Sequence, residues 1–514
     1  MSVDTILVLD FGGQYTHLIA RRIREHNVYS EVVHGDISPE EFRALVKELN
    51  LKGMILSGGP SSVYDKKSPK MDKGLLDHSL PILGLCYGHQ LLAFLFGGEV
   101  QTGKRHEYGL SIVKIDNASE ILEGLNEVEK VWMSHADVVT RLSEDLEILA
   151  HTENCPVAAF MHKIKPIYGI QWHPEVSHTE GGELILRNFV FNICKCRPEW
   201  TMENYIERAI DEVKKTVGKS RAIIALSGGV DSSAATILAS KAIGRNLTAV
   251  FVDHGLLREN EPNFVESAFR KFDINFIKLS EQKRFLKELK GIVDPEKKRK
   301  VIGREFIKVF ENTARKINAE YLIQGTIYPD RIESGFSRFS DKIKTHHNVG
   351  GIPSKIAFKG IVEPLRDLYK DEVKKIAESL GLPKEIAWRQ PFPGPGLAVR
   401  IIGEVTKKKL EIIKRADKIV TEEIEESSLS DGLWQYFAVL TNTKSTGVKG
   451  DARAYGYTVA VRIVESIDAM TANFAKIPYE VLERISTRIT NEISEVTRVV
   501  YDITHKPAAT IEWE

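Results

Sequence analysis

A cysteine held between glycines carries the clearest chemical signal in this sequence. The stretch Gly84-Leu-Cys86-Tyr87-Gly88-His-Gln follows an apolar run and precedes a helical pattern. A reactive side chain on a tight turn from strand to helix is the nucleophile-elbow arrangement. The positive end of the following helix favours the thiolate, which attacks carbonyl carbon. The pattern predicts Cys86 as a nucleophile, whereas the alternative is a buried structural cysteine in a glycine-rich turn.

Two further stretches could complete a reaction centre around Cys86. Ile170-Gln-Trp-His173-Pro-Glu175 ends an expected strand, and residues two apart in extended chain project to the same side. His173 could therefore be the base, and Glu175 could orient its imidazole. The segment 57–60, Ser-Gly-Gly-Pro, ends a neighbouring expected strand, so its amides could form an oxyanion hole.

A second glycine loop predicts an anion site in the middle of the chain. Its residues are Leu226, Ser227, Gly228, Gly229, Val230, Asp231, Ser232 and Ser233, between an apolar run and an alanine-rich helical pattern. Backbone N–H groups and the positive helix end would point at one spot there. The hydroxyls of Ser227, Ser232 and Ser233 add donors, and Asp231 needs a magnesium ion between itself and phosphate. The alternative is a Gly-Ser turn that only caps a helix.

This loop lacks the lysine of a Walker A loop, since no Gly-Lys-Ser/Thr closes it. We expect the missing positive charge to come from Lys342 and Lys344. They lie in residues 333–355, where few apolar residues recur, so the segment is predicted to be a mobile lid. The adjacent His346 and His347 belong to the same lid, and no further ligand cluster supports a metal there.

Composition sets outer limits on the function. The chain has 514 residues, which favours two to four domains, and its 71 basic and 71 acidic residues cancel. No net field therefore favours nucleic acid, and no apolar run reaches the roughly 18 residues of a membrane helix. The four cysteines are too few for a disulfide framework, which favours a reduced, cytoplasmic protein. Cys194-Lys-Cys196 has no second Cys/His pair at ligand spacing.

Alternating apolar runs and helical patterns predict how these loops are positioned. Strands are expected at 5–10, 54–57 and 82–85, and again at 222–226, 247–253, 276–279 and 321–324, with helices between them. We therefore predict two doubly wound α/β domains with their loops at the strand C-termini. They occupy residues 1–197 and 198–389.

The last part, 390–514, is predicted to be a small α+β domain. Strands are expected at 400–404, 433–440, 455–464 and 496–503, with helices at 407–426 and 479–493 and a glycine loop at 444–453. The tail carries Ile511 and Trp513 where an ordinary terminus would be polar, so we expect it to dock.

Two other stretches are given structural interpretations. Residues 98–105 fit a Walker A pattern until Arg105 replaces Ser/Thr, and they follow a helix instead of a strand. The basic run 297–300 is interpreted as one solvated helix face.

These motifs resemble known families. Residues 3–196, with Gly-Cys86-x-Gly-His-Gln and His173-Pro-Glu175, resemble a class I glutamine amidotransferase. That resemblance implies glutamine hydrolysis through a thioester at Cys86, with the amides of Gly59 and Tyr87 holding the oxyanion. Ser-Gly-Gly-x-Asp-Ser-Ser resembles the loop of N-type ATP pyrophosphatases, which cleave ATP between the α and β phosphates. With the Thr-Ile-Glu-Trp-Glu tail, the order of modules is similar to the glutamine-hydrolysing GMP synthetase family.

The resemblance implies a reaction and its partners. The family aminates xanthosine 5'-phosphate (XMP) to GMP with ammonia from L-glutamine, using ATP and Mg²⁺, through an adenylated XMP that releases AMP and pyrophosphate. It implies a homodimer paired through residues 390–514, and XMP contacts from Lys506, Glu512, Lys449 and Arg400. The alternatives are another glutamine-dependent adenylating ligase, such as NAD synthetase or a tRNA-modifying enzyme, and a non-enzymatic nucleotide sensor.

Overall fold

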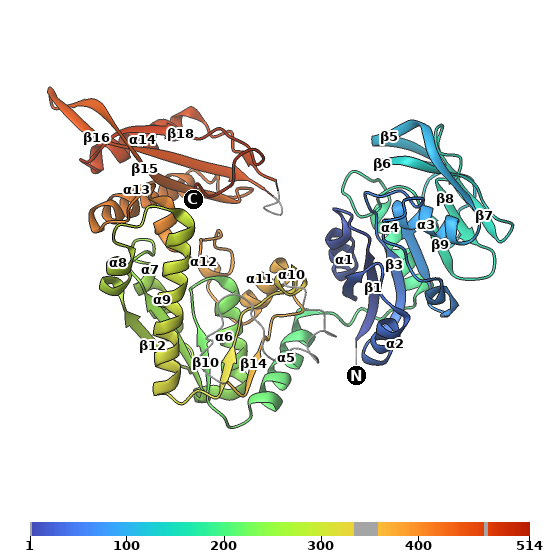
Figure 1. Ribbon diagram of the computed structural model, residues 1–514, viewed down its shortest axis with the longest axis horizontal. Helices are drawn as coiled ribbons and strands as arrows, with labels where there is room; N and C mark the ends of the chain where they lie inside the picture. The colour runs from blue at the N-terminus through green and yellow to red at the C-terminus, as the bar shows by residue number, and fades with distance from the viewer. Residues whose placement is uncertain (1–2, 334–357, 467–470) are drawn as a thin grey trace. The chain divides into compact units, whose positions relative to one another are not determined.

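The computed structural model describes residues 3–333, 358–466 and 471–514 (Figure 1). The described chain forms two compact units, one ending at Tyr205 and the other beginning at Ile206. The boundary falls inside helix α5 (Met202–Val217). None of the helices in these ranges is long and apolar enough to cross a membrane.

Among the described residues of the first unit, nine strands form one mixed sheet in the order β2-β1-β3-β4-β9-β8-β7-β5-β6. Neighbours from β2 to β9 pair in parallel, and the later pairs are antiparallel. The strands are β1 (Asp4–Asp10), β2 (Tyr29–His34), β3 (Asn50–Leu56), β4 (Ile82–Leu85), β5 (Glu99–Ile115), β6 (Val128–Arg141), β7 (Leu146–His151), β8 (Ala159–His162) and β9 (Ile167–Ile170). The helices are α1 (Thr16–Glu25), α2 (Pro39–Glu48), α3 (Tyr87–Leu95) and α4 (Gly182–Arg187).

The parallel half of this sheet is a buried core. β1 and β4 consist almost wholly of buried residues, as expected for parallel strands covered on both faces. The strand order reverses between β1 and β3, so the loops after β1, β3 and β4 meet at one edge. Residues 98–105 enter strand β5, which agrees with rejecting them as a phosphate loop.

The second unit begins with a parallel sheet in the order β12-β11-β10-β13-β14. Its strands are β10 (Ala222–Ala225), β11 (Leu247–Asp253), β12 (Asn275–Ser280), β13 (Tyr321–Ile323) and β14 (Gly360–Val362). The helices are α6 (Val230–Ile243), α7 (Glu261–Phe269), α8 (Gln282–Leu289), α9 (Pro295–Lys316), α10 (Tyr328–Glu333), α11 (Lys370–Ser379) and α12 (Lys384–Ala387). The strand order reverses at β10 and β13, which is where such sheets bind ligands.

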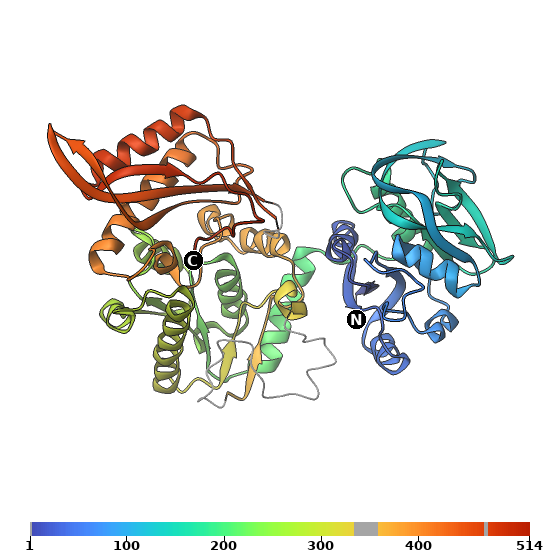
Figure 2. The same cartoon turned by 45° about the horizontal axis from the view of Figure 1, so that its top comes forward.

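The rest of the second unit is an α+β layer, drawn in orange and red in Figure 2. Strands β15 (Gln435–Lys449), β16 (Ala452–Glu465), β17 (Asn473–Phe474) and β18 (Val496–Tyr501) form its sheet. It is covered by α13 (Lys407–Glu426) and α14 (Tyr479–Glu492). One apolar core continues from the parallel sheet, with Ile223 and Val250, into this layer, with Ile413 and Ile485.

Two expectations for this layer were wrong. Residues 400–404 form no strand: the short 3₁₀ helix η5 (Gly396–Arg400) ends there, and Ile401 makes a single bridge to Leu440. Residues 444–453 are not an open loop, because β15 and β16 pair as a hairpin out to Lys449 and Ala452. The small and charged residues there do not show the apolar alternation by which a strand is predicted, because this end of the hairpin has no apolar face. The fold class, two α/β sheets followed by an α+β part, is confirmed.

Candidate active sites

Cys86 lies on a strained turn between β4 and α3. Its φ of 53° and ψ of −103° belong to a region that non-glycine residues rarely adopt. The turn requires glycine on both sides: a Cβ at Gly88 would lie 2.5 Å from the Leu56 carbonyl oxygen, and one at Gly84 would lie 2.5 Å from the Gly88 carbonyl carbon. The local sequence therefore forces the sharp bend that the elbow pattern predicted.

The structure brings His173 and Glu175 to Cys86. His173 is hydrogen bonded to Cys86, and its Nδ1 lies 2.7 Å from Glu175 Oε1. The backbone around His173 is fixed as well, because its N–H donates to Trp132 O and its carbonyl accepts from the Thr179 hydroxyl. This is a nucleophile, a base and an orienting carboxylate in hydrogen-bonding order.

The electrostatics of His173 come from its burial beside a carboxylate. Burial by itself lowers the pKa of His173, but the Glu175 carboxylate and the hydrogen bonds with Cys86 and Glu175 outweigh it and hold the pKa well above its usual value. The imidazole therefore retains a proton readily next to Sγ of Cys86. A positive neighbour favours the thiolate form of the nucleophile.

The glycine loop after β3 faces the same centre. A Cβ at Gly58 would lie 3.3 Å from Cε1 of His173 and 3.6 Å from Cβ of Cys86. Gly59 follows it in the loop, and Tyr87 is the first residue of α3, so its N–H has no partner inside the helix. The loop thus lies beside the nucleophile, as the oxyanion-hole prediction requires.

Sequence reasoning missed two residues that hold this centre. The ring of Tyr15 contacts the ring of His173 edge-on, with centroids 4.9 Å apart. Arg22 Nε donates to the backbone oxygen of Glu175 at 2.9 Å. Both lie at the start of the chain, at or near α1, and nothing in their spacing pointed to residues about 150 positions later.

The other three cysteines are in a different environment. Burial raises the pKa of Cys155 and of Cys196 to about 12, and it raises the pKa of Cys194 well above its usual value. All three are buried and carry no disulfide. Within the described residues no three His, Cys, Asp or Glu side chains gather as a metal site, Cys194 and Cys196 included.

The loop between β10 and α6 has the form expected of an anion cradle. Gly228 adopts a φ of +82°, and α6 begins at Val230, directly after Gly229. The hydroxyls of Ser227 and Ser232 lie 2.9 Å apart, and Ser227 Oγ accepts from the Gly229 N–H. Ser227 and Gly229 are exposed. Ser233, in contrast, is fully buried, so its hydroxyl faces the interior.

Asp231 is paired with a lysine that the sequence analysis did not identify. Lys370 Nζ, at the start of α11, lies 2.6 Å from Asp231 Oδ2 and 2.8 Å from Oδ1. Gly325, after β13, packs against the same turn, since a Cβ there would lie 3.1 Å from the Asp231 carbonyl carbon. The two loops at the strand-order reversal therefore meet at Asp231. Lys342, Lys344, His346 and His347 lie outside the described residues.

The four predicted XMP-binding residues lie in different environments. Arg400 is fully buried, where Nη2 and Nε contact the Glu512 carboxylate at 2.9 and 3.1 Å and Nη1 contacts Asp417. Lys449 Nζ instead binds backbone oxygens at the end of α14, including Thr490 O at 2.7 Å. The backbone of Lys506 pairs with that of Ala472. The structure brings Arg400 and Glu512 together and leaves Lys449 away from this pair.

Three segments of the chain match known protein families. A family described as glutamine amidotransferase class-I matches residues 7–193, a PP-loop domain matches 202–389, and a GMP synthase C terminal domain matches 422–513. Three relatives are named GMP synthase (glutamine-hydrolyzing). Those from Caldicellulosiruptor saccharolyticus and Clostridium acetobutylicum are 54% and 52% identical and match over 100% of both chains. The one from Caldanaerobacter subterraneus is 53% identical over 99% of both chains.

The chain belongs to the glutamine-hydrolyzing GMP synthase family. The resemblance inferred from its motifs is confirmed. The amidotransferase match of this GMP synthase family member contains Cys86, His173 and Glu175, and the PP-loop match contains residues 226–233 and Lys370. The C-terminal match contains Lys449, Lys506 and Glu512, whereas Arg400 precedes it.

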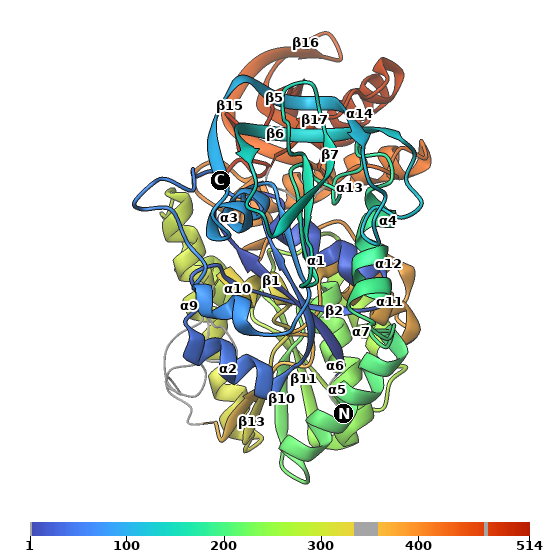
Figure 3. The ribbon, with the colours of Figure 1, turned by 90° about the vertical axis from the view of Figure 1, so that its right-hand side faces the viewer.

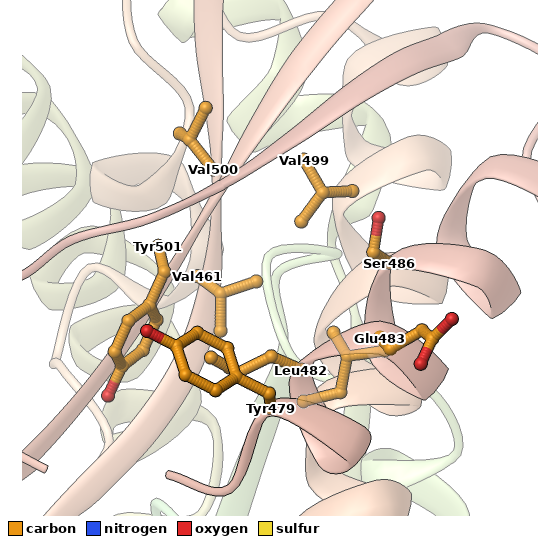
Figure 4. A pocket seen from close by; sticks show the side chains of 9 residues that line it. Val461, Tyr479, Leu482, Glu483, Ser486, Val499, Val500 and Tyr501 are labelled. Carbon is orange, nitrogen blue, oxygen red and sulfur yellow. The ribbon is translucent and has the colours of Figure 1, made fainter. Parts of the chain in front are cut away.

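The C-terminal part of this GMP synthase family member also carries an apolar hollow of about 360 Å³, shown in Figure 4. It lies between α14, with Tyr479 and Leu482, and the sheet, with Val499 and Tyr501. Tyr479 is 86% exposed, which is unusual for a large aromatic side chain. The hollow has no counterpart among the residues predicted for nucleotide binding.

Proposed function

We propose that this chain is a glutamine-hydrolysing GMP synthase, which converts XMP, ATP and L-glutamine to GMP, AMP, pyrophosphate and L-glutamate. The observation that supports it most is the pair of sites on one chain. One is a Cys86–His173–Glu175 triad, and the other is a serine-glycine loop at the strand-order reversal of a parallel sheet. Full-length relatives that carry the GMP synthase name support XMP as the molecule that accepts the ammonia.

The first site supplies ammonia. Sγ of Cys86 attacks the side-chain amide carbon of glutamine, and the amides of Gly59 and Tyr87 bind the oxyanion. His173 protonates the leaving nitrogen, so ammonia departs and a glutamyl thioester remains. Water, deprotonated by His173, then cleaves the thioester to glutamate and restores the thiol. Glu175 keeps the imidazole oriented throughout.

The second site activates the acceptor. The 2-oxygen of XMP attacks the α-phosphorus of ATP, and the bond to pyrophosphate breaks, giving adenylated XMP. Ammonia attacks C2 of the base, and AMP leaves with the oxygen. The backbone amides of residues 227–233 and the hydroxyls of Ser227 and Ser232 bind the departing pyrophosphate, whereas the buried hydroxyl of Ser233 does not take part. Lys342 and Lys344, with His346 and His347, form the proposed lid.

Asp231 and Lys370 set the charge at this loop. Asp231 fits as a magnesium ligand, because Mg²⁺ takes one or two carboxylates and keeps substrate phosphates and water as its other ligands. Bound there, Mg²⁺ supplies neutralisation of phosphate charge. Lys370, which holds Asp231 in this structure, lies close enough to contact phosphate oxygens once ATP occupies the loop. The positive charge missing from the loop thus has a source besides the lid.

The acceptor site is proposed around the tail. Arg400 is buried and binds the Glu512 carboxylate, and Lys506 lies on the same tail, which supports Glu512 and Lys506 as the XMP contacts with Arg400 acting through Glu512. Lys449 would have to exchange contacts to reach XMP, because its Nζ donates to the carbonyl oxygens of Thr490, Ile493 and Ser494 at the end of α14. The domain limits 1–197, 198–389 and 390–514 and the cytoplasmic location also stay predictions.

The apolar hollow beside α14 supports the proposed homodimer. Large apolar side chains are exposed across the same part of the chain, at Val448, Tyr455, Tyr479, Val500 and Ile503. Tyr479 and Val500 line the hollow itself, and an apolar hollow with exposed apolar side chains is typical of a protein–protein contact. We infer that a second copy covers this surface.

A coupled assay tests the proposed function. The purified chain, incubated with XMP, ATP, MgCl₂ and glutamine, should form GMP, AMP, pyrophosphate and glutamate in equal amounts. Replacing XMP with nicotinic acid adenine dinucleotide distinguishes the NAD synthetase alternative. Amination of that acceptor without GMP formation from XMP would overturn the assignment.

A further inference from the structure

Lys298 is a fully buried lysine in the first turn of α9. Its neighbours in the basic run behave differently, since Lys297 and Lys300 are exposed. Successive helix residues point about 100° apart, so a run of four cannot share one face. The expectation of a single solvated face was therefore wrong at Lys298.

The ammonium of Lys298 has an acceptor for each of its donors. Nζ lies 2.6 Å from the Ile401 carbonyl oxygen and 3.3 Å from that of Ala398, and it contacts the Glu514 carboxylate. Glu514 also accepts from the Gly403 N–H, and its backbone oxygen accepts from Arg299. A buried ammonium is tolerated only when it is paired and hydrogen bonded in this way.

These contacts join three segments distant in the sequence. α9 packs against the part of the second unit that carries the phosphate loop, residues 398–401 follow the proline-rich stretch, and Glu514 ends the tail. Figures 1, 2 and 3 show the C-terminus beside one end of α9. Lys298 therefore ties the tail to the scaffold of the phosphate loop.

Two further buried cations, Arg400 and Arg462, hold the tail on either side of Lys506. Arg400 binds Glu512, two residues before Glu514. Arg462, also fully buried, donates to the carbonyl oxygens of Thr504 and Thr510. The segment between these points contains Lys506. Its position is thus set by contacts with the rest of the unit, with Lys298 at the far end.

We propose that Lys298 is a positioning residue for XMP: by binding Glu514 it fixes the tail so that Glu512 and Lys506 face the acceptor. This rests on the proposed function. Lys298 itself touches no substrate. Without it the tail keeps the contacts of Arg400 and of Arg299 but loses the buried ion pair that ties the Glu514 side chain to α9, so the acceptor site is held less firmly relative to the phosphate loop.

Steady-state kinetics of Lys298→Met separate positioning from simple stability. We expect KM for XMP to rise ~10-fold, as for a lost charge-assisted contact, while KM for ATP stays within about twofold of wild type. Glutaminase activity in the absence of nucleotides should not change. Lys300→Met, on the same helix but 74% exposed, is the matched control and should behave like wild type.

Glu514→Gln supplies a second route if Lys298→Met folds poorly. It keeps the size of the side chain and removes its charge, and the double variant should resemble the single ones because both remove the same contact. Hydrogen exchange of residues 504–514 should be faster in each variant than in Lys300→Met. Unchanged exchange together with unchanged KM for XMP would overturn the proposal, as would equal rises of KM for XMP and ATP.

A wild-type chain that forms no GMP would reject the proposed function before any variant is made. In that case the proposal that Lys298 positions the tail for XMP binding is rejected as well. The exchange measurement still reports whether Lys298 fixes the tail.

Discussion

Cys86 and the other three cysteines are all buried, but they have different neighbours. Cys86 lies at a helix start beside a protonated imidazole, whereas burial raises the pKa of Cys155 and Cys196 to about 12. The difference comes from the neighbours and not from the residue. Cys86 is hydrogen bonded to His173, and the glycine loop at Gly58 lies beside it.

Replacing Cys86 should therefore separate the two chemical halves. In Cys86→Ala, synthesis with glutamine should fall by ~10³-fold or more, since no other nucleophile replaces the thiol. Synthesis with added ammonium chloride should stay within about twofold of wild type. GMP formation measured with each nitrogen source checks this, and Cys155→Ala serves as the control. Loss of both activities would contradict the division into two sites.

His89, three residues after Cys86, makes the first unit sensitive to acid. Full burial, with His135 nearby, lowers the pKa of His89 from 6.5 to about 3, against the opposing hydrogen bonds with Gly169 and Val157. The neutral ring therefore stabilises the folded state above pH 6.5, and this contribution is lost as the pH falls from 6.5 toward 3.

Glutamine in place of His89 should weaken that dependence. His89→Gln keeps a donor for the Val157 carbonyl oxygen but has no proton to gain. Its melting temperature should drop less than that of wild type between pH 7 and pH 5, as followed by calorimetry. An identical drop would mean that His89 does not control the acid response.

At the scale of elements, the start of α11 brings positive charge to the phosphate loop. Lys370 is the first residue of α11. This helix follows β14, the parallel strand at the edge of the sheet beside β13. Helix starts after parallel strands gather at one sheet edge, so the topology places Lys370 beside Asp231. A glycine at position 325 lets the two loops approach.

Removing this lysine should affect the ATP half alone. In Lys370→Met, XMP-dependent pyrophosphate release should fall by ~10²-fold, the usual cost of losing one charge that stabilises a departing group. Basal glutaminase activity should not change. Lys375→Met, on the exposed face of α11, is the control. Pyrophosphate release at the wild-type rate in Lys370→Met would contradict this role of Lys370, and the positive charge at the phosphate loop would then have to come from the proposed lid.

The same scale shows what the sequence could and could not predict. Helix α13 was predicted at its observed bounds, because Thr406 caps it and an apolar stripe runs along it. The triad was predicted because its residues occur in short motifs. The sequence could not predict the roles of Lys370, Tyr15 and Lys298, because each of them contacts a partner more than a hundred positions away. The hairpin at 444–453 was missed because its solvated end lacks an apolar alternation.

At the scale of the molecule, the proposed dimer depends on the hollow beside α14. Tyr479→Glu puts a charge at its rim, so we expect the variant to be monomeric, because burying an unpaired carboxylate opposes association. Light scattering after gel filtration measures the mass. Tyr108→Glu, at another exposed tyrosine in the first unit, is the control. A Tyr479→Glu variant that stays dimeric would place the interface elsewhere.

The apolar core of the second unit runs without interruption from Ile223 to Ile485. A gene cut between residues 389 and 390 would leave both products with the halves of one core exposed, and such surfaces cause aggregation. A cut near residue 200 would separate two units that each keep a complete core. The ammonia-producing part could therefore exist as a separate subunit, whereas the nucleotide-handling parts must be inherited as one gene.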